Sequence, residues 1–150
     1  MNDRFTSGFV AGVVGGFIAY LNNFIFIHFF KFGSLRYSDF SSILIFGHRS
    51  ASIEEGLLSS LAFLGFSGSL GVIFSYLIPR ISERFYWYKA LIYGFGIWFC
   101  IYAVTSLFKV PSLTDISFPS ALTNSISSAL YGLITAWAFR RLTKAETLST

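Results

Sequence analysis

The apolar run from residue 5 to residue 30 most limits what this chain can fold into, because a helix of that length crosses a hydrocarbon core of about 30 Å. At about 100° per residue, its small and amide residues fall in one arc of roughly 140°, and bulky apolar residues fill the rest of the wheel. The arc holds Gly8, Ala11, Gly12, Gly15, Gly16, Ala19, Asn22 and Asn23. Small residues four apart let helix backbones meet closely in lipid, so the run predicts a membrane helix packed on another helix.

The composition is typical of a protein embedded in lipid. Of the 150 residues, 54% are hydrophobic and 12% are charged, whereas about 25% are charged in soluble domains. Lys and Arg lie at the ends of apolar runs and not in one basic patch, which argues against nucleic-acid binding. The single Cys100 lies inside an apolar run, where a small hydrophobe is expected. We therefore expect one integral membrane domain over residues 1–150 whose first partner is the lipid bilayer.

Four apolar runs predict an all-α, polytopic membrane protein with four transmembrane helices. The expected spans are residues 5–30, 53–78, 90–108 and 118–139, and a polar tail follows over residues 140–150. The second span should start at the capping box Ser52-Ile53-Glu54-Glu55 and stop at Pro79. Pro111 should follow the end of the third span, and we expect the whole unit to be helical.

Residues 37–46 are too few to cross a bilayer, although apolar residues recur there at helical spacing. Gly33 and Gly47 are expected to break the chain on either side. We therefore predict a short interfacial or re-entrant helix between the first and second spans.

The distribution of cations predicts the orientation, because four spans put both termini on one side. That side would carry Arg4, Arg80, Arg84, Lys89, Arg140, Arg141 and Lys144. The other side would carry Lys31, Arg36, Arg49 and Lys109. Since cytoplasmic loops carry the excess of Lys and Arg, both termini are expected in the cytoplasm.

The fourth span carries small and polar residues at intervals of four, so it is expected to contact more than one neighbour. The residues predicted to pack helices together, on the first and fourth spans, are Gly8, Gly12, Gly15, Gly16, Ala19, Ser120, Asn124, Ser128, Gly132 and Ala136.

No charged residue falls at the centre of a predicted span, which argues against ion-coupled transport. The remaining polar candidates inside the spans are Asn22, Asn23, Ser67, Ser69, Asn124 and Ser128. They either line a polar cavity or hold helices together by hydrogen bonds, which are worth about 0.6 kcal/mol each in membrane proteins. Helix association is the simpler interpretation.

The loop between the first two spans gathers His28, Asp39, His48, Glu54 and Glu55, which suggests a divalent-metal site as one alternative. Their spacing matches no compact ligand motif. No nucleophile elbow, phosphate loop or dinucleotide fingerprint occurs in the sequence. We therefore expect no metal, no cofactor and no enzymatic activity.

In layout, the chain resembles small four-span bacterial membrane proteins of families without an established activity (YqhR-like or YagU-like). The stretches that carry the resemblance are Gly8 to Gly16, Tyr37-Ser38-Asp39-Phe40, Leu44-Ile45-Phe46-Gly47, Gly68 to Pro79, Tyr93 to Phe99 and Leu107-Phe108-Lys109. The resemblance implies a bacterial inner-membrane location and transfers no chemistry.

The leading functional hypothesis is a non-catalytic membrane protein that acts through helix association, as a homo-oligomer or as a small subunit of a larger membrane complex. One alternative is a passive pore or carrier for a small neutral or weakly polar solute. A second alternative is the metal or enzymatic site in the outer loop that His28 and His48 would supply.

Overall fold

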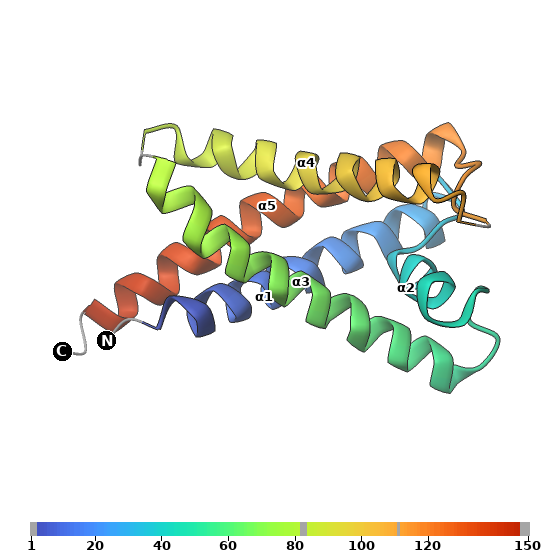
Figure 1. Cartoon of the computed structure of the whole chain (residues 1–150), viewed down its shortest axis with the longest axis horizontal. Coiled ribbons are helices and arrows are strands. Elements are labelled where there is room, and N and C mark those ends of the chain that lie inside the picture. Colours follow the sequence, from blue (N-terminus) through green and yellow to red (C-terminus); the bar gives the residue numbers. More distant parts are fainter. Residues whose placement is uncertain (1–2, 82–83, 111, 148–150) are drawn as a thin grey trace.

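The chain forms five helices, seen here in a computed structural model that describes residues 3–81, 84–110 and 112–147. In chain order they are α1 (Arg4–His28), α2 (Tyr37–Phe46), α3 (Ile53–Ile81), α4 (Tyr86–Leu107) and α5 (Phe118–Thr147). Four are long, and α2 is a short helix near one end of the bundle (Figure 1). The described residues contain no strand. The predicted all-α class and the short helix between the first two long helices are confirmed.

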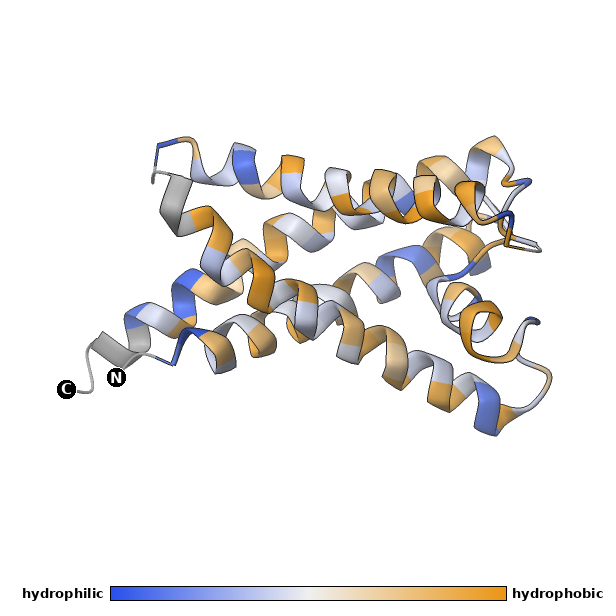
Figure 2. Cartoon of the chain, viewed as in Figure 1, coloured by the Kyte–Doolittle hydropathy of each residue, from blue (hydrophilic) through white to orange (hydrophobic). Residues whose placement is uncertain are grey.

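Three helices are long and apolar enough to cross a membrane: α1, the Ile53–Ile78 part of α3, and α4. The sequence predicts a fourth span over residues 118–139, and the corresponding helix α5 is long but too polar to meet the same criterion. The most hydrophilic residues lie mainly toward the two ends of the bundle (Figure 2). The described part of the chain therefore has the layout of a multi-pass membrane protein with three candidate spans.

The helix ends differ from the predicted ones at three places. α3 continues past Pro79 to Ile81, because a proline this close to a helix end removes only one terminal hydrogen bond. α4 begins at Tyr86, earlier than the predicted residue 90. α5 runs to Thr147 through most of the predicted polar tail, since no helix-breaking residue lies there. Pro111 and residues 148–150 lie outside the described residues.

The expected start of α3 and the expected breaks around α2 are confirmed. The Ser52 hydroxyl accepts a 3.2 Å hydrogen bond from the Glu55 N–H, and the Glu55 carboxylate accepts one of 2.8 Å from the Ala51 N–H. Gly33 and Gly47 have φ angles of +100° and +79°, which glycine adopts without strain. Gly47 is the C-cap of α2, whereas Gly33 lies in the loop between the end of α1 at His28 and the start of α2.

α1 lies at the centre of the bundle, where it packs along both α3 and α5, while α4 packs along α5. α3 and α4 diverge from the turn that joins them, and α2 lies at the wide end of the gap (Figure 1). The N-terminus, the C-terminus and the α3–α4 turn share one end of the bundle (Figure 1).

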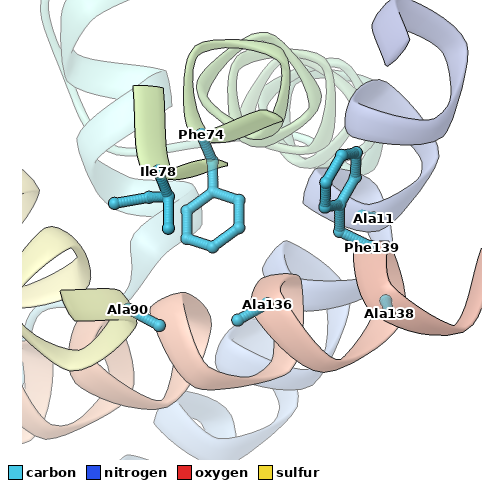
Figure 3. Close-up of a cluster of buried hydrophobic side chains, with 7 residues drawn as sticks. All are labelled: Ala11, Phe74, Ile78, Ala90, Ala136, Ala138 and Phe139. Carbon is cyan, nitrogen blue, oxygen red and sulfur yellow. The ribbon is translucent and has the colours of Figure 1, made fainter. Parts of the chain in front are cut away.

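Glycines allow the closest helix contacts. A Cβ added to Gly12 would overlap the Ser67 carbonyl oxygen and the backbone of Gly71, so α1 and α3 meet backbone to backbone. α4 and α5 also meet backbone to backbone, at Gly94 and Gly132. Next to these contacts, one apolar cluster joins α1, α3, α4 and α5 (Figure 3). Its buried members are Ala11, Phe74, Ile78, Ala90, Ala136, Ala138 and Phe139.

Candidate functional site: a cavity beside a buried amide network

Two buried asparagines form the polar centre of the bundle. Asn23 on α1 donates a 2.6 Å hydrogen bond from its amide nitrogen to the amide oxygen of Asn124 on α5. Asn23 is 1% exposed and Asn124 is fully buried. A buried amide needs partners for both its oxygen and its nitrogen, so the remaining atoms of the pair must be satisfied by neighbouring elements.

Two tyrosines complete this network. The Asn124 amide nitrogen donates a 2.9 Å hydrogen bond to the Tyr102 hydroxyl oxygen on α4. The Tyr37 hydroxyl donates to the Asn124 backbone carbonyl at 2.9 Å and lies 2.9 Å from the Ser128 hydroxyl. The network therefore joins α1, α4 and α5 to the first residue of α2.

The direction of each hydrogen bond in this chain is determined by one backbone group. The Tyr37 N–H can only donate, so the Asn23 atom that lies 3.3 Å from it is the amide oxygen. Asn23 must then donate to Asn124, and Asn124 must donate to the Tyr102 hydroxyl oxygen. The Tyr102 proton is consequently directed away from the amides, and no hydrogen bond from it to an acceptor is found among the described residues.

Trp98 lies one helical turn before Tyr102, and their ring centroids are 5.1 Å apart. The Trp98 indole nitrogen is buried and has no well-aligned hydrogen-bond acceptor in the described part of the chain. Indole can only donate, so Trp98 cannot receive the Tyr102 proton. This corner of α4 therefore contains more donors than acceptors.

A cavity of about 280 Å³ lies against this corner, in the gap between α3 and α4. Its wall is mostly apolar, with some hydroxyl-bearing residues, and no charged side chain is found among the described residues that line it. The apolar residues, drawn from α1 to α4, are Ala19, Phe40, Leu44, Ile45, Ala62, Phe63, Phe66, Leu70, Ile97, Trp98 and Ile101. The hydroxyl-bearing residues are Tyr37, Ser41, Ser67, Tyr102, Ser128 and Tyr131.

The cavity reaches the outer surface of the bundle at α2 and α3. Leu44, Ile45 and Phe66 line it and are 62%, 46% and 51% exposed. These apolar side chains stand on the outer surface of α2 and α3, where acyl chains would lie in a bilayer. A molecule could therefore reach the cavity from the lipid phase without passing through water.

The structure brings only some of the predicted polar residues together. Asn23 and Asn124 form the network, while Ser67 and Ser128 line the cavity. Asn22 points elsewhere, because its amide donates to the Ser127 hydroxyl at 2.9 Å. Ser69 lies exposed on α3 and hydrogen-bonds the Gly65 carbonyl of its own helix.

The predicted packing residues of α1 contact two different helices. Gly8, Gly12 and Gly16 face α3, where an added Cβ would meet Ser75, the Ser67 backbone or the Ser67 side chain. Gly15 faces Thr135 and Tyr131 of α5. Ala19 lines the cavity.

The predicted packing residues of α5 face the other helices and the loop after α1. Gly132 meets the backbone of Ala90 and Gly94 on α4. Ser120 accepts a hydrogen bond from the Ser34 N–H at 2.9 Å, and the Ala136 carbonyl accepts one from the Tyr86 hydroxyl at 3.0 Å.

The histidines of the outer loop do not converge. His28 stacks on Phe24 of its own helix, whereas His48 lies 3.9 Å from Glu55. Within residues 3–81, 84–110 and 112–147, no three His, Cys, Asp or Glu side chains gather in a group that could hold a metal ion.

Four aromatic residues of the site were not among the sequence candidates: Tyr37, Trp98, Tyr102 and Tyr131. Tyr131 is buried on α5, and its hydroxyl donates a 2.7 Å hydrogen bond to the Ser67 carbonyl on α3. The only available signal was a polar aromatic residue inside a long apolar run, as for Tyr102 and Tyr131. Such residues also occur at membrane interfaces, so this signal alone does not assign them to a site.

The chain matches no protein-family model, no curated protein and no solved structure. The resemblance to small four-span bacterial families stays a prediction, and the function is argued from the geometry.

Proposed function

We propose that this chain is a non-catalytic membrane protein that binds a small, neutral, mainly apolar molecule in the cavity between α3 and α4. The observation that carries the proposal is a cavity of about 280 Å³, apolar over most of its wall and open to the side. Ligand pockets combine an apolar lining with a few polar groups that set orientation, and this volume lies close to their lower limit of about 300 Å³.

The polar groups of the cavity favour a neutral ligand that carries one hydrogen-bond acceptor. The described lining residues include no Asp, Glu, Lys or Arg, so a charged ligand would lose its hydration without gaining a counter-ion. Tyr102 lines the cavity, and its hydroxyl proton has no acceptor among the described residues. An oxygen of the ligand would receive it. This proposal develops the alternative of a carrier for a small neutral solute, and it requires a binding cavity but no continuous pore.

We further propose that α5 crosses the membrane as a fourth span and that both termini face the cytoplasm of a bacterial inner membrane. α5 runs the length of the bundle (Figure 1), and most of its polar side chains between Ser120 and Thr135 are buried. Those buried include Ser120, Thr123, Asn124, Ser127, Ser128 and Thr135. A helix shielded by its neighbours need not be apolar all round.

Quenching of Trp98 fluorescence tests the cavity. In full-length protein with Trp87 and Trp137 replaced by Phe, 1-bromodecane added in mild detergent should quench Trp98 saturably, because bromine would enter next to the indole. Ala62→Phe fills the cavity and should abolish saturation. Ser69→Phe adds the same bulk on the exposed side of α3 and should not. Equal quenching in all three proteins would refute a ligand site.

Self-association through α3 is the second candidate, and one observation favours it. Gly65 has no atom within 4 Å of an added Cβ, and Ser69, four residues later, is exposed on the same helix. This step of small residues is directed outward, unlike the α1 glycines that already contact α3 and α5. Gly65→Leu should therefore reduce the oligomer mass in mild detergent. A mass unchanged from that of the parent would remove this candidate.

A further inference from the structure

A second hollow lies at the end of the bundle where α2 and α3 begin, and it shares no lining residue with the cavity between α3 and α4. Its volume is about 400 Å³. Arg36 precedes α2 and Arg49 precedes α3, and both side chains are exposed and line this groove. Ser34, Ser38 and Ser50 add hydroxyl groups at the same level.

Two arginines against one acid leave this groove with a net positive charge. Asp39 is the one acidic residue among the described lining residues, and its carboxylate already accepts a 2.9 Å hydrogen bond from the Arg36 backbone N–H. No ion pair joins Arg36 or Arg49 to an acid anywhere in the described ranges. Two guanidinium groups on neighbouring loops suit a phosphate, because each can donate two parallel hydrogen bonds to its oxygens.

Away from the arginines the groove wall is mixed. It continues along α3 through Ile53, Gly56, Leu57 and Ser60, which at about 1.5 Å per residue reaches about 10 Å into the bundle. The Ser60 and Tyr20 hydroxyl oxygens lie 3.5 Å apart and so satisfy one another. Ile53 and Leu57 are 83% and 62% exposed, and an added Cβ at Gly56 would meet nothing within 4 Å. The groove therefore joins two arginines to an exposed apolar strip on α3, which suits a phospholipid headgroup and the start of its acyl chains.

We infer that this groove binds an anionic phospholipid, with its phosphate between Arg36 and Arg49 and its glycerol and first acyl carbons along Gly56 and Leu57. The inference does not depend on the ligand proposed for the other cavity. Free phosphate shares the headgroup chemistry but would gain nothing from the exposed face of α3, so the apolar wall favours the lipid.

Retention of phosphatidylglycerol by the full-length protein, measured by native mass spectrometry in mild detergent, tests the inference. The parent should retain it, and Arg36→Gln/Arg49→Gln should weaken retention at least about tenfold, because both charged donors to the phosphate are lost. The matched control is Lys31→Gln/Lys109→Gln, which removes the same charge at the same end from residues that do not line the groove. Equal weakening in both double variants would indicate general electrostatic attraction and overturn the site.

Two further arms separate the possible sources of phosphate and do not rely on arginine variants. Diacylglycerol, which lacks phosphate, should not be retained, and inorganic phosphate should not displace phosphatidylglycerol. Gly56→Leu should also weaken phosphatidylglycerol retention, because it fills the apolar part of the groove without changing charge. Displacement by inorganic phosphate, or full retention by Gly56→Leu, would show that no lipid chain lies in this groove.

Discussion

The amide of Asn23 donates a 2.6 Å hydrogen bond to the amide oxygen of Asn124, joining α1 to α5 across 101 residues of sequence. The same Asn124 side chain donates to Tyr102, and its backbone carbonyl accepts from Tyr37. This one residue therefore connects the central helix of the bundle with α2, α4 and the wall of the cavity.

Replacing Asn124 with Leu should destabilise the folded protein by about 2 kcal/mol, because it leaves the buried Asn23 nitrogen without its acceptor and Tyr102 without its donor. Unfolding of the purified protein in a mixed-detergent titration measures the change. Asn22→Leu is the control, since it breaks only the hydrogen bond to Ser127 and should cost about 0.6 kcal/mol. Equal effects of the two substitutions would contradict a central role for Asn124.

Gly12→Ala should destabilise the protein by about 1–3 kcal/mol, because the added Cβ overlaps the Ser67 carbonyl and the Gly71 backbone, neither of which can move alone. Gly65→Ala makes the same chemical change on α3 where nothing lies within 4 Å. Its effect should stay within about 0.5 kcal/mol. The same detergent titration compares them, and a Gly12→Ala variant as stable as the parent would disprove the close α1–α3 contact.

Opposite ends of α5 should react with thiol reagents from opposite sides of the membrane. In a Cys100→Ala background, single cysteines would replace Asp115, just before α5, and Arg141, near its end; both residues are exposed. A membrane-impermeant maleimide added to intact bacteria should label the cysteine at 115 and spare the one at 141 until the cells are lysed. Labelling of both in intact cells would mean that α5 does not cross.

Acid should loosen the first turn of α1. The Thr6 hydroxyl hydrogen-bonds the Asp3 carboxylate, as does the Phe5 N–H at 3.0 Å, and these bonds lower the Asp3 pKa, with the Thr6 bond as the larger cause. Because the folded-state pKa is lowered, the cap stabilises the helix above the usual carboxyl pKa and is lost as the pH falls through the lowered value.

Hydrogen exchange at the Phe5 amide, followed from pH 6 downward, measures this loss after correction for the intrinsic exchange rate. Asp3→Asn retains a capping oxygen that does not titrate in this range, so its protection should not change with pH. If the parent shows the same flat profile, the Asp3 carboxylate does not hold the cap.

The helical class, the short helix before α3 and the start of α3 were predictable because each depends on neighbouring residues. An apolar run of a given length specifies a helix, and Ser52 and Glu55 mark a helix start within one turn. The small-residue arc on α1 was visible for the same reason. The sequence did not show which helices this arc would contact, because Gly12 contacts α3 and Gly15 contacts α5.

The site was less predictable because its members come from all parts of the chain. Asn23 and Asn124 could be recognised as buried amides, but Tyr37 lies 87 residues from its Asn124 partner. The alternative in which all the amides and serines share one cavity overlooked the rotation of each helix. That rotation turns Asn22 toward Ser127 and leaves Ser69 on the outer surface.

The sequence by itself determined that this protein is a set of long helices, four of which it predicted as membrane spans, because length and hydropathy are local properties. Only the tertiary structure decided where α5 lies, which amides meet, and that the divergence of α3 from α4 leaves a cavity open to the side. The physical reason is that hydrogen bonds and close glycine contacts satisfy polar groups between helices. When the sequence of α5 is considered alone, its polar side chains lower the mean hydropathy and so argue against a membrane helix.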